Sequence, residues 1–353
     1  MQISCIYVKL DGRNRVLSLL QWTFYVSVLT YHYALLCMST IHMIDINMVL
    51  FCQSTHFTLL VQLTIILLVC LQTKHRQMTL FHKLLIHDFF DYQEPPAEGD
   101  DVLRTSMVRE RRILSSIPVA VALAAGAVLV IAPIVDKQAA LFDFDTMSET
   151  FSTHLPYPYA KYFYQTREGF NYYFALGGQL IIGGLLTVVI GSGGFLFLNL
   201  SLNLTLQLKL LQNSLDQIET RAENMCQRFF GKMKRDTTTQ YDDYHFAYCY
   251  GECLRKNFKH HQIILRAFNY TEEIVSIPVF LAYMTGTIVI ALSLISAGSA
   301  DELPGTTVAS MVLCGVEIGY MFLFSVFGQR LADLVMHYFI IRIIIINFLK
   351  HII

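Results

Sequence analysis

One acidic side chain stands inside a long apolar run of this sequence. Glu317 lies within Thr306–Gln329, and no other Asp or Glu falls in the chain's six long apolar stretches. A carboxylate in the hydrocarbon core of a membrane is costly, so Glu317 is a candidate functional residue. The alternative is a carboxylate near the interface that is hydrogen-bonded to a neighbouring helix or faces water. The sequence leaves both interpretations open.

A cluster of cysteines and histidines raises the question of a metal site. Cys249 and Cys253 are one helical turn apart, and His245, His260 and His261 lie nearby. Zinc is bound by such side chains, but the spacing is not CxxC and the segment is patterned as an amphipathic helix. We therefore favour cysteines that pack within a helix over a metal site.

Catalytic motifs are missing from the sequence. It contains no GxSxG, no HExxH, no phosphate-binding glycine loop and no pair of carboxylates within an apolar stretch. Each of these motifs places the groups that a particular reaction needs. We therefore do not expect an enzyme, and we expect no cofactor.

The composition is that of a membrane protein. The 353 residues are 54% hydrophobic and 15% charged, and the mean hydropathy is +0.46. The apolar residues are bunched into long runs, which is typical of a polytopic membrane protein. The net charge of −1 gives no indication of nucleic-acid binding. The first run is too long for a signal peptide and has no small-residue cleavage site after it, so we expect it to remain as a span.

Six stretches qualify as membrane spans, each of which needs about 20 apolar residues. The second is short, and the length of the fourth indicates a tilted helix that runs past the membrane. We therefore expect an all-α, polytopic helical bundle whose spans are Val16–Ile41, His56–Gln72, Ile113–Val135, Asn171–Leu200, Ile274–Ala297 and Thr306–Gln329.

The basic residues predict that the N-terminus is cytoplasmic. The loop between the first two spans has no Lys or Arg, whereas the loops after the second and fourth spans are rich in both. Lys and Arg mark cytoplasmic loops. This orientation disfavours a G-protein-coupled receptor, whose N-terminus is outside. It also places the sequons at Asn199, Asn203 and Asn269 near the cytoplasmic face, where we expect no glycosylation.

The fourth span is rich in small residues. Glycines let helix backbones approach closely, so we expect this span to pack tightly against others. A deliberate bend or hinge is the alternative. The glycines are Gly177, Gly178, Gly183, Gly184, Gly191, Gly193 and Gly194.

Aromatic residues cluster before and at the start of span four. Tyrosines at an interface commonly anchor a membrane protein. A run this dense, beside the apolar outer ends of spans two and three, would also line a pocket for a small volatile or apolar ligand. The cluster consists of Phe151, Tyr157, Tyr159, Tyr162, Phe163, Tyr164, Phe170, Tyr172 and Tyr173.

The long loop after span four is patterned as helix. In "LTLQLKLLQNSLDQIETRAENM" and "YDDYHFAYCYGECLRKNFKHHQIILRAF", apolar residues recur three and four apart. We expect spans four and five to continue into the cytoplasm there. The segment is then either a solvated helical hairpin or a domain for subunit assembly.

At "LRKNFKHHQIILRAFNYTEEIVSIPVFLAYMTGTIVIALSLISA" the chain resembles the insect odorant receptors. The pattern is a basic stretch, then His261 and Gln262, then Phe268, and Glu273 at the entry to span five. The resemblance continues through span six into "FSVFGQRLADL". Earlier, "LFHKLLIHDFFDY" and "RERRI" also fit. Layout agrees over most of the chain, and specific motifs agree over the final third.

The resemblance implies an inverted seven-span topology in a multi-pass plasma-membrane protein of olfactory sensory neurons. Members of this family are ligand-gated cation channels in which a tuning subunit assembles with a shared co-receptor as a tetramer. The implied partners are a small volatile odorant, the co-receptor and membrane lipid. Placed by depth, the ligand-binding residues expected here are Phe57, Leu60, Val130, Ile134, Tyr172, Tyr173, Leu176, Thr287, Thr307, Ser310 and Met311.

Two alternatives to an odorant-gated channel subunit stay open. A gustatory receptor has the same architecture, fits these motifs less well, and would respond without the co-receptor. A membrane transporter would show ligand flux without an ionic current, but the two related halves with broken helices that many transporters have are not found in this sequence.

The predicted organisation has four parts. Residues 1–200 hold four spans with the ligand-pocket side, 201–273 form the cytoplasmic helical extension for subunit assembly, 274–329 hold spans five and six, and 330–353 form an atypical tail.

The apolar run in the tail is short for a span. Phe339–Leu349 has 11 residues, and a helix of that length covers about half of a ~30 Å hydrocarbon core. Arg342 inside it would cost roughly 2.5–3.5 kcal/mol at the membrane centre. We expect an interfacial or packed stub in place of the family's seventh helix, and a truncated gene product or a short isoform as its origin.

Overall fold

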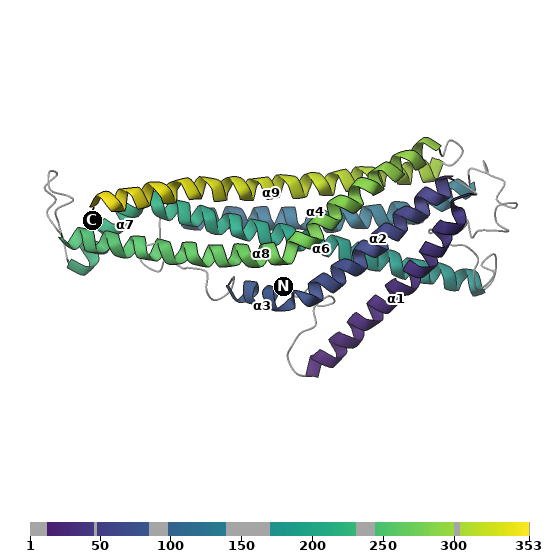
Figure 1. The fold of residues 1–353 in the computed structure, drawn as a ribbon, viewed down its shortest axis with the longest axis horizontal. Helices are drawn as coiled ribbons and strands as arrows, with labels where there is room; N and C mark the ends of the chain where they lie inside the picture. The colour runs from purple at the N-terminus through teal and green to yellow at the C-terminus, as the bar shows by residue number, and fades with distance from the viewer. Residues whose placement is uncertain are drawn as a thin grey trace. The chain divides into compact units, whose positions relative to one another are not determined.

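The structure, a computed structural model, describes residues 13–45, 48–84, 98–138, 170–230, 244–299 and 304–352. The regular secondary structure in these residues is helical, which confirms the predicted all-α fold (Figure 1). The helices are α1 (Arg13–Met43), α2 (Met48–Thr73), α3 (His75–Lys83), α4 (Asp100–Gln138), α6 (Phe170–Asp216), α7 (Ile218–Phe230), α8 (Tyr244–Ser299) and α9 (Pro304–Ile352).

Six of these helices are long and apolar enough to cross a membrane, as predicted. The candidate spans within the described residues are Leu19–Met43, Met48–Thr73, Asp100–Ala132, Tyr173–Asp216, Tyr244–Ser299 and Pro304–Asp333. A helix satisfies all of its interior backbone hydrogen bonds within itself, which is why apolar runs of this length fold as helices in lipid.

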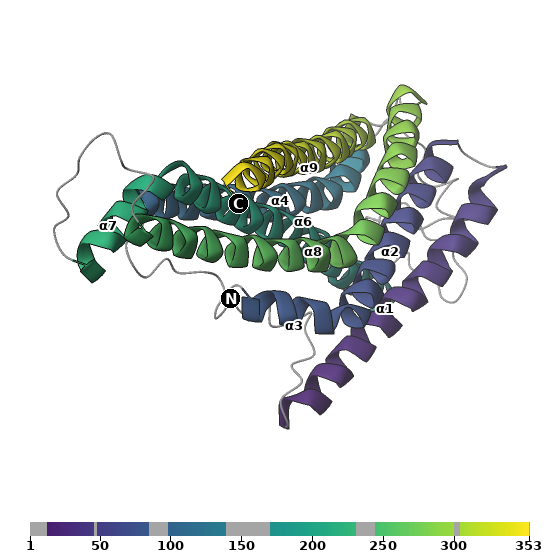
Figure 2. The same ribbon diagram turned by 60° about the vertical axis from the view of Figure 1, so that its left-hand side comes forward.

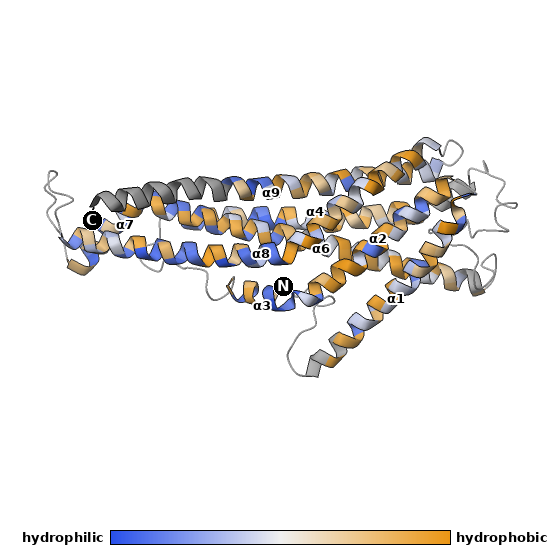
Figure 3. Cartoon of the chain, viewed as in Figure 1, coloured by the Kyte–Doolittle hydropathy of each residue, from blue (hydrophilic) through white to orange (hydrophobic). Residues whose placement is uncertain are grey.

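The chain divides into two compact units. The first consists of Met1–His75, Ser115–Phe197 and Ile274–Ser325, and the second of Arg76–Leu114, Leu198–Glu273 and Val326–Ile353. Figure 3 shows apolar residues along most of α2, whereas polar residues are frequent in the N-terminal half of α8. The first unit therefore contains the strongly apolar helix segments that carry the candidate site.

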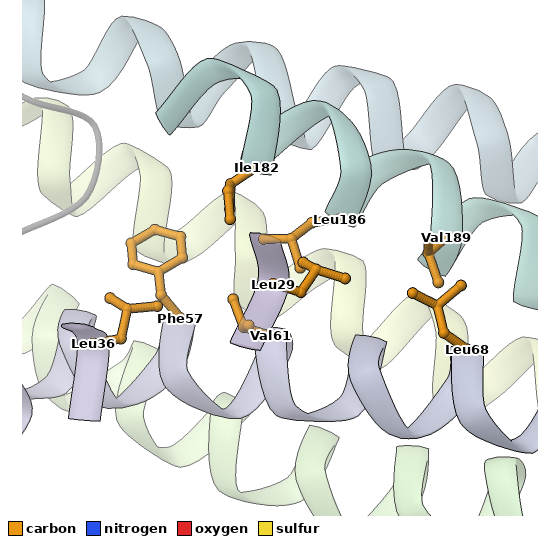
Figure 4. Packing of buried hydrophobic residues seen from close by; sticks show 8 residues of the cluster. All are labelled: Leu29, Leu36, Phe57, Val61, Leu68, Ile182, Leu186 and Val189. Carbon is orange, nitrogen blue, oxygen red and sulfur yellow. The ribbon is translucent and has the colours of Figure 1, made fainter. Parts of the chain in front are cut away.

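The core of the first unit is a row of aliphatic side chains. Leu29 and Leu36 of α1 meet Val61 and Leu68 of α2. Ile182, Leu186 and Val189 of α6 and the ring of Phe57 complete the cluster (Figure 4). These residues recur at helical spacing on each element, so one face of each of the three helices is buried in this contact.

A polar contact between α1 and α2 explains why span two is longer than predicted. The sequence places its start at His56, whereas α2 begins at Met48. The hydroxyl of Ser54 lies 2.8 Å from that of Thr40 on α1, and Thr55 donates to the Phe51 carbonyl. Because these hydroxyls are hydrogen-bonded within the helix pair, the polar residues do not end the span.

Glycines of α6 bring it into close contact with α4, as predicted. A Cβ atom at Gly191 would lie 3.3 Å from the Cα atom of Val119, and one at Gly194 would lie 2.9 Å from the Cβ atom of Pro118. Gly177, in contrast, has nothing within 4 Å of that position. Close packing therefore depends on the glycines in the C-terminal part of the predicted span. The alternative of a hinge receives no support, since α6 is one continuous helix.

The second unit buries several polar side chains between α6, α7 and α8. The imidazole Nε2 of His260 lies 2.9 Å from the Gln207 side-chain oxygen, and Ser214 donates to the Asn257 side-chain oxygen at 2.6 Å. Arg221, only 1% exposed, donates to Ser214 and Asn257. The predicted helices in 201–273 are present. Their cytoplasmic location and their role in assembly stay predictions.

The cysteines considered for a metal site pack in an apolar contact, as the favoured interpretation expects. Cys249 and Cys253 are fully buried with Cys226 and Met225. Among the described residues, no group of three or more His, Cys, Asp or Glu is arranged to hold a metal ion.

The backbone of the tail continues span six. The sequence predicts an interfacial or packed stub at Phe339–Leu349. In the structure, α9 runs as one helix from Pro304 to Ile352, beside α4 (Figures 1 and 2). The described side chains of α9 end at Asp333. The interfacial position of the stub therefore stays a prediction.

The glycine contact gives a stability prediction. We expect Gly194→Ala to lower the melting temperature of the receptor purified in detergent, because the new methyl group meets Pro118 and Tyr320 at 3.0 Å or less. Gly177→Ala is the control, and it should leave the melting temperature unchanged or raise it, since Ala favours a helix over Gly by up to about 1 kcal/mol. Equal effects of the two substitutions would contradict the close contact.

Candidate functional site

The first unit contains a cavity of about 500 Å³ among α2, α4, α6 and α9. This volume is in the range of roughly 300–1,000 Å³ that is usual for small-molecule sites. The lining is almost entirely aliphatic. It consists of Phe57, Leu60, Ala122, Leu123, Ala125, Gly126, Ala127, Leu129, Val130, Ile131, Gln179, Leu180, Gly183, Gly184, Leu186, Thr187, Val188, Ile190, Leu313, Val316, Glu317 and Tyr320.

Small residues on two helices explain why this space is not filled. The α4 wall comes from the run "ALAAGAV", in which Ala122, Ala125 and Gly126 line the cavity. Gly183 and Gly184 face it from α6. Such side chains extend at most one carbon from the backbone, so the helices can enclose a volume that larger residues would occupy.

A second, smaller cavity of about 80 Å³ adjoins the first. The two share Leu60, Ile190, Glu317 and Tyr320 as lining residues. The smaller one extends along α8, where Pro278 lines it. The residues between the two cavities are therefore in a position to contact a ligand from both sides.

Two of the four polar side chains that line the larger cavity bond to helix backbone. The Tyr320 hydroxyl donates to the Pro118 carbonyl at 2.7 Å. The Thr187 hydroxyl donates to the Gly183 carbonyl at 2.8 Å. Both bonds use the one proton that a hydroxyl can donate. These two hydroxyls therefore have no proton left to donate to a ligand.

The carboxylate of Glu317 lies at the meeting point of the two cavities. Residue 317 is 13 positions after Pro304, the first residue of α9, which is about 20 Å along a helix and well inside a ~30 Å hydrocarbon core. A Cβ atom at Gly286 of α8 would lie 3.3 Å from Glu317 Oε2. The carboxylate therefore approaches the α8 backbone at a position where any side chain would crowd it.

The structure does not support the alternative in which Glu317 is hydrogen-bonded to a neighbouring helix, whereas the alternative in which it faces water stays open. Among the described residues, its carboxylate accepts no hydrogen bond and forms no ion pair. An unpaired charge at the membrane centre costs on the order of 2.5–3.5 kcal/mol on insertion scales. The carboxylate of Glu317 is thus available to a ligand in the cavity.

Three of the eleven predicted ligand-binding residues line the larger cavity: Phe57, Leu60 and Val130. Six others line neither cavity. Leu176 and Thr307 are half-buried, Ser310 is buried and donates to Ser296, and Tyr173, Thr287 and Met311 are exposed. The side chains of Ile134 and Tyr172 are outside the described residues.

The predicted aromatic cluster is mostly outside the described residues, because it falls in 139–169. Of its members, Phe170 and Tyr173 begin α6 with exposed fractions of 82% and 70%. Whether the cluster lines a pocket stays a prediction.

Sequence reasoning missed Tyr320 and most of the α4 wall, of which it named Val130. The signal for the wall was present, since "AVALAAGAV" is a run of small residues within an apolar span. The hydrogen bond of Tyr320 to Pro118 joins residues 202 positions apart. No local pattern reports a contact at that separation.

The Tyr320 hydrogen bond gives a second stability prediction. We expect Tyr320→Phe to lower the free energy of unfolding by about 1 kcal/mol, the usual net contribution of such a bond. Tyr31→Phe is the control, because Tyr31 is 54% exposed. Melting temperatures of the two variants in detergent test this, and an unchanged value for Tyr320→Phe would contradict the contact.

Comparison with known proteins places these helices in context. The profile of the family described as "7tm Odorant receptor" matches residues 47–336. The match therefore includes every residue that lines the two cavities. A search of curated proteins found no match.

Proposed function

Because this chain belongs to the odorant receptor family, we propose that it is the ligand-binding subunit of an odorant-gated cation channel and acts with a co-receptor. Family membership gives it a chemosensory receptor role, and its six apolar helices make it a multi-pass membrane protein. Ion conduction, the co-receptor and the class of ligand are the parts that we propose.

The observation that supports this proposal is the 500 Å³ cavity. Its aliphatic walls suit a small apolar molecule, because burying the ligand removes apolar surface from water or lipid headgroups. The cavity is built from four helices of one compact unit. A ligand that fills it would therefore stabilise one arrangement of these helices, which is what gating by ligand requires.

The test is expression of the full chain with the co-receptor in cells. Calcium entry or membrane current is recorded while a broad panel of volatiles is applied. The proposal expects a current that depends on both the volatile and the co-receptor. Silence across the panel despite surface expression would contradict it. A current without the co-receptor would favour a gustatory-type receptor, and ligand flux without current a transporter.

A matched pair of variants links the response to the cavity. Ala125 lines it, whereas Ala124 is exposed and does not. We expect Ala125→Leu to reduce responses to the larger active volatiles more than to the smaller ones, because the added side chain occupies cavity volume.

The control is Ala124→Leu, which should leave the size preference unchanged. Surface expression of both variants is measured in the same cells. If Ala125→Leu scaled all responses equally, or if Ala124→Leu changed the size preference as much, the cavity would not be the binding site.

A further inference from the structure

The charged side chain that lines the larger cavity is acidic. Among the described residues that line this cavity, Glu317 is the only acidic one, and none is Lys, Arg or His. The same carboxylate also lines the adjoining smaller cavity. A ligand in either cavity therefore meets a negative or acidic group and no positive one.

Neighbouring side chains do not satisfy this carboxylate. The nearest hydroxyl along α9, that of Tyr320, donates to the Pro118 carbonyl. Thr187, on the α6 wall, donates to the Gly183 carbonyl. Glu317 itself has no hydrogen bond or ion pair among the residues that the structure describes. A half-buried carboxylate without a partner among the described residues is a strong acceptor for a donor that enters the cavity.

The contact of Glu317 with α8 sets where the amine of a ligand would meet the carboxylate. Gly286 leaves the space that Glu317 Oε2 occupies, and Met321 borders the same position, with its sulfur 3.4 Å from a Cβ placed at Gly286. The carboxylate thereby lies against α8, and it lines both cavities. The α4 and α6 walls of the larger cavity are mostly small or aliphatic residues, and Gln179 and Thr187 are the polar residues of the α6 wall.

We propose that Glu317 selects ligands that carry an amine on a small apolar body. The ammonium group pairs with the carboxylate, and the hydrocarbon part lies against the α4 and α6 walls. The bound pair carries no net charge, so its transfer into an apolar site costs far less than that of either ion alone. This inference rests on the proposed function and adds the chemical class of the ligand.

The experiment compares compounds that differ only in the head group. Hexylamine, hexanol and methyl pentyl ether are applied to cells that express the full chain with the co-receptor. The unaltered receptor should respond to the amine at the lowest concentration. Glu317→Gln keeps the size of the side chain and one oxygen that accepts hydrogen bonds, but it replaces the other oxygen by a donating NH₂ group and removes the charge. It should raise the half-maximal concentration for the amine about tenfold or more, and for the alcohol by less than about twofold.

Two further variants separate recognition from folding. Glu317→Asp retains the charge on a shorter side chain, so the preference for the amine should persist in weakened form. Glu272→Gln makes the same chemical change at an exposed position of α8 and should alter neither response. Surface expression of each variant is measured in parallel.

Several results would overturn the inference. One is a Glu317→Gln variant that shifts the amine and the alcohol equally. Another is an unaltered receptor that responds to the alcohol and the ether but not to the amine, which would leave the proposed function standing. Silence of the unaltered receptor to every compound in a broad panel would instead contradict the proposed function, and this inference with it.

Discussion

The contact of α6 with α4 and α9 at Gly194 is the constraint on which the site depends. A Cβ atom at this position would come within 3.0 Å of both Pro118 and Tyr320, so only a residue without a side chain lets the three helices meet there. The Tyr320 hydroxyl then bonds to the Pro118 carbonyl. With the helices fixed by this contact, the small residues one or more turns away cannot close the space between them, and a cavity remains.

The same constraint decides the chemistry of the cavity. Because the hydroxyls near the helix crossings bond to backbone carbonyls, they stabilise the packing and offer no donor to a ligand. Glu317 is the exception, since its carboxylate lies against Gly286 without a hydrogen-bonding partner in the described part of the chain. Apolar walls would admit many small molecules and distinguish them mainly by size. A single carboxylate adds a distinction by charge that shape alone does not provide.

The sequence predicted the features that depend on local composition. Long apolar runs predicted the six helical spans, and glycine spacing predicted the close approach of α6, although among the described α6 glycines the tight contacts are at Gly191 and Gly194. It failed where distant segments decide the outcome. Placement by depth in the membrane put Thr287 and Met311 in the pocket. Depth gives the position of a residue along its helix, but it does not say which face of the helix points toward a neighbouring helix. Both residues are exposed in the structure. That face is set by contacts such as the one between Tyr320 and Pro118, which no local pattern encodes.

The central claim is that a ligand binds in the cavity between α4 and α6. The most direct measurement is photolabelling of the receptor with a diazirine derivative of an activating volatile, followed by mapping of the labelled peptides by mass spectrometry. The account predicts labels on cavity-lining residues within 122–131 and 179–190, and their loss when excess unlabelled volatile is added. Competable labels confined to other segments, for example around Thr287 and Met311, would contradict it.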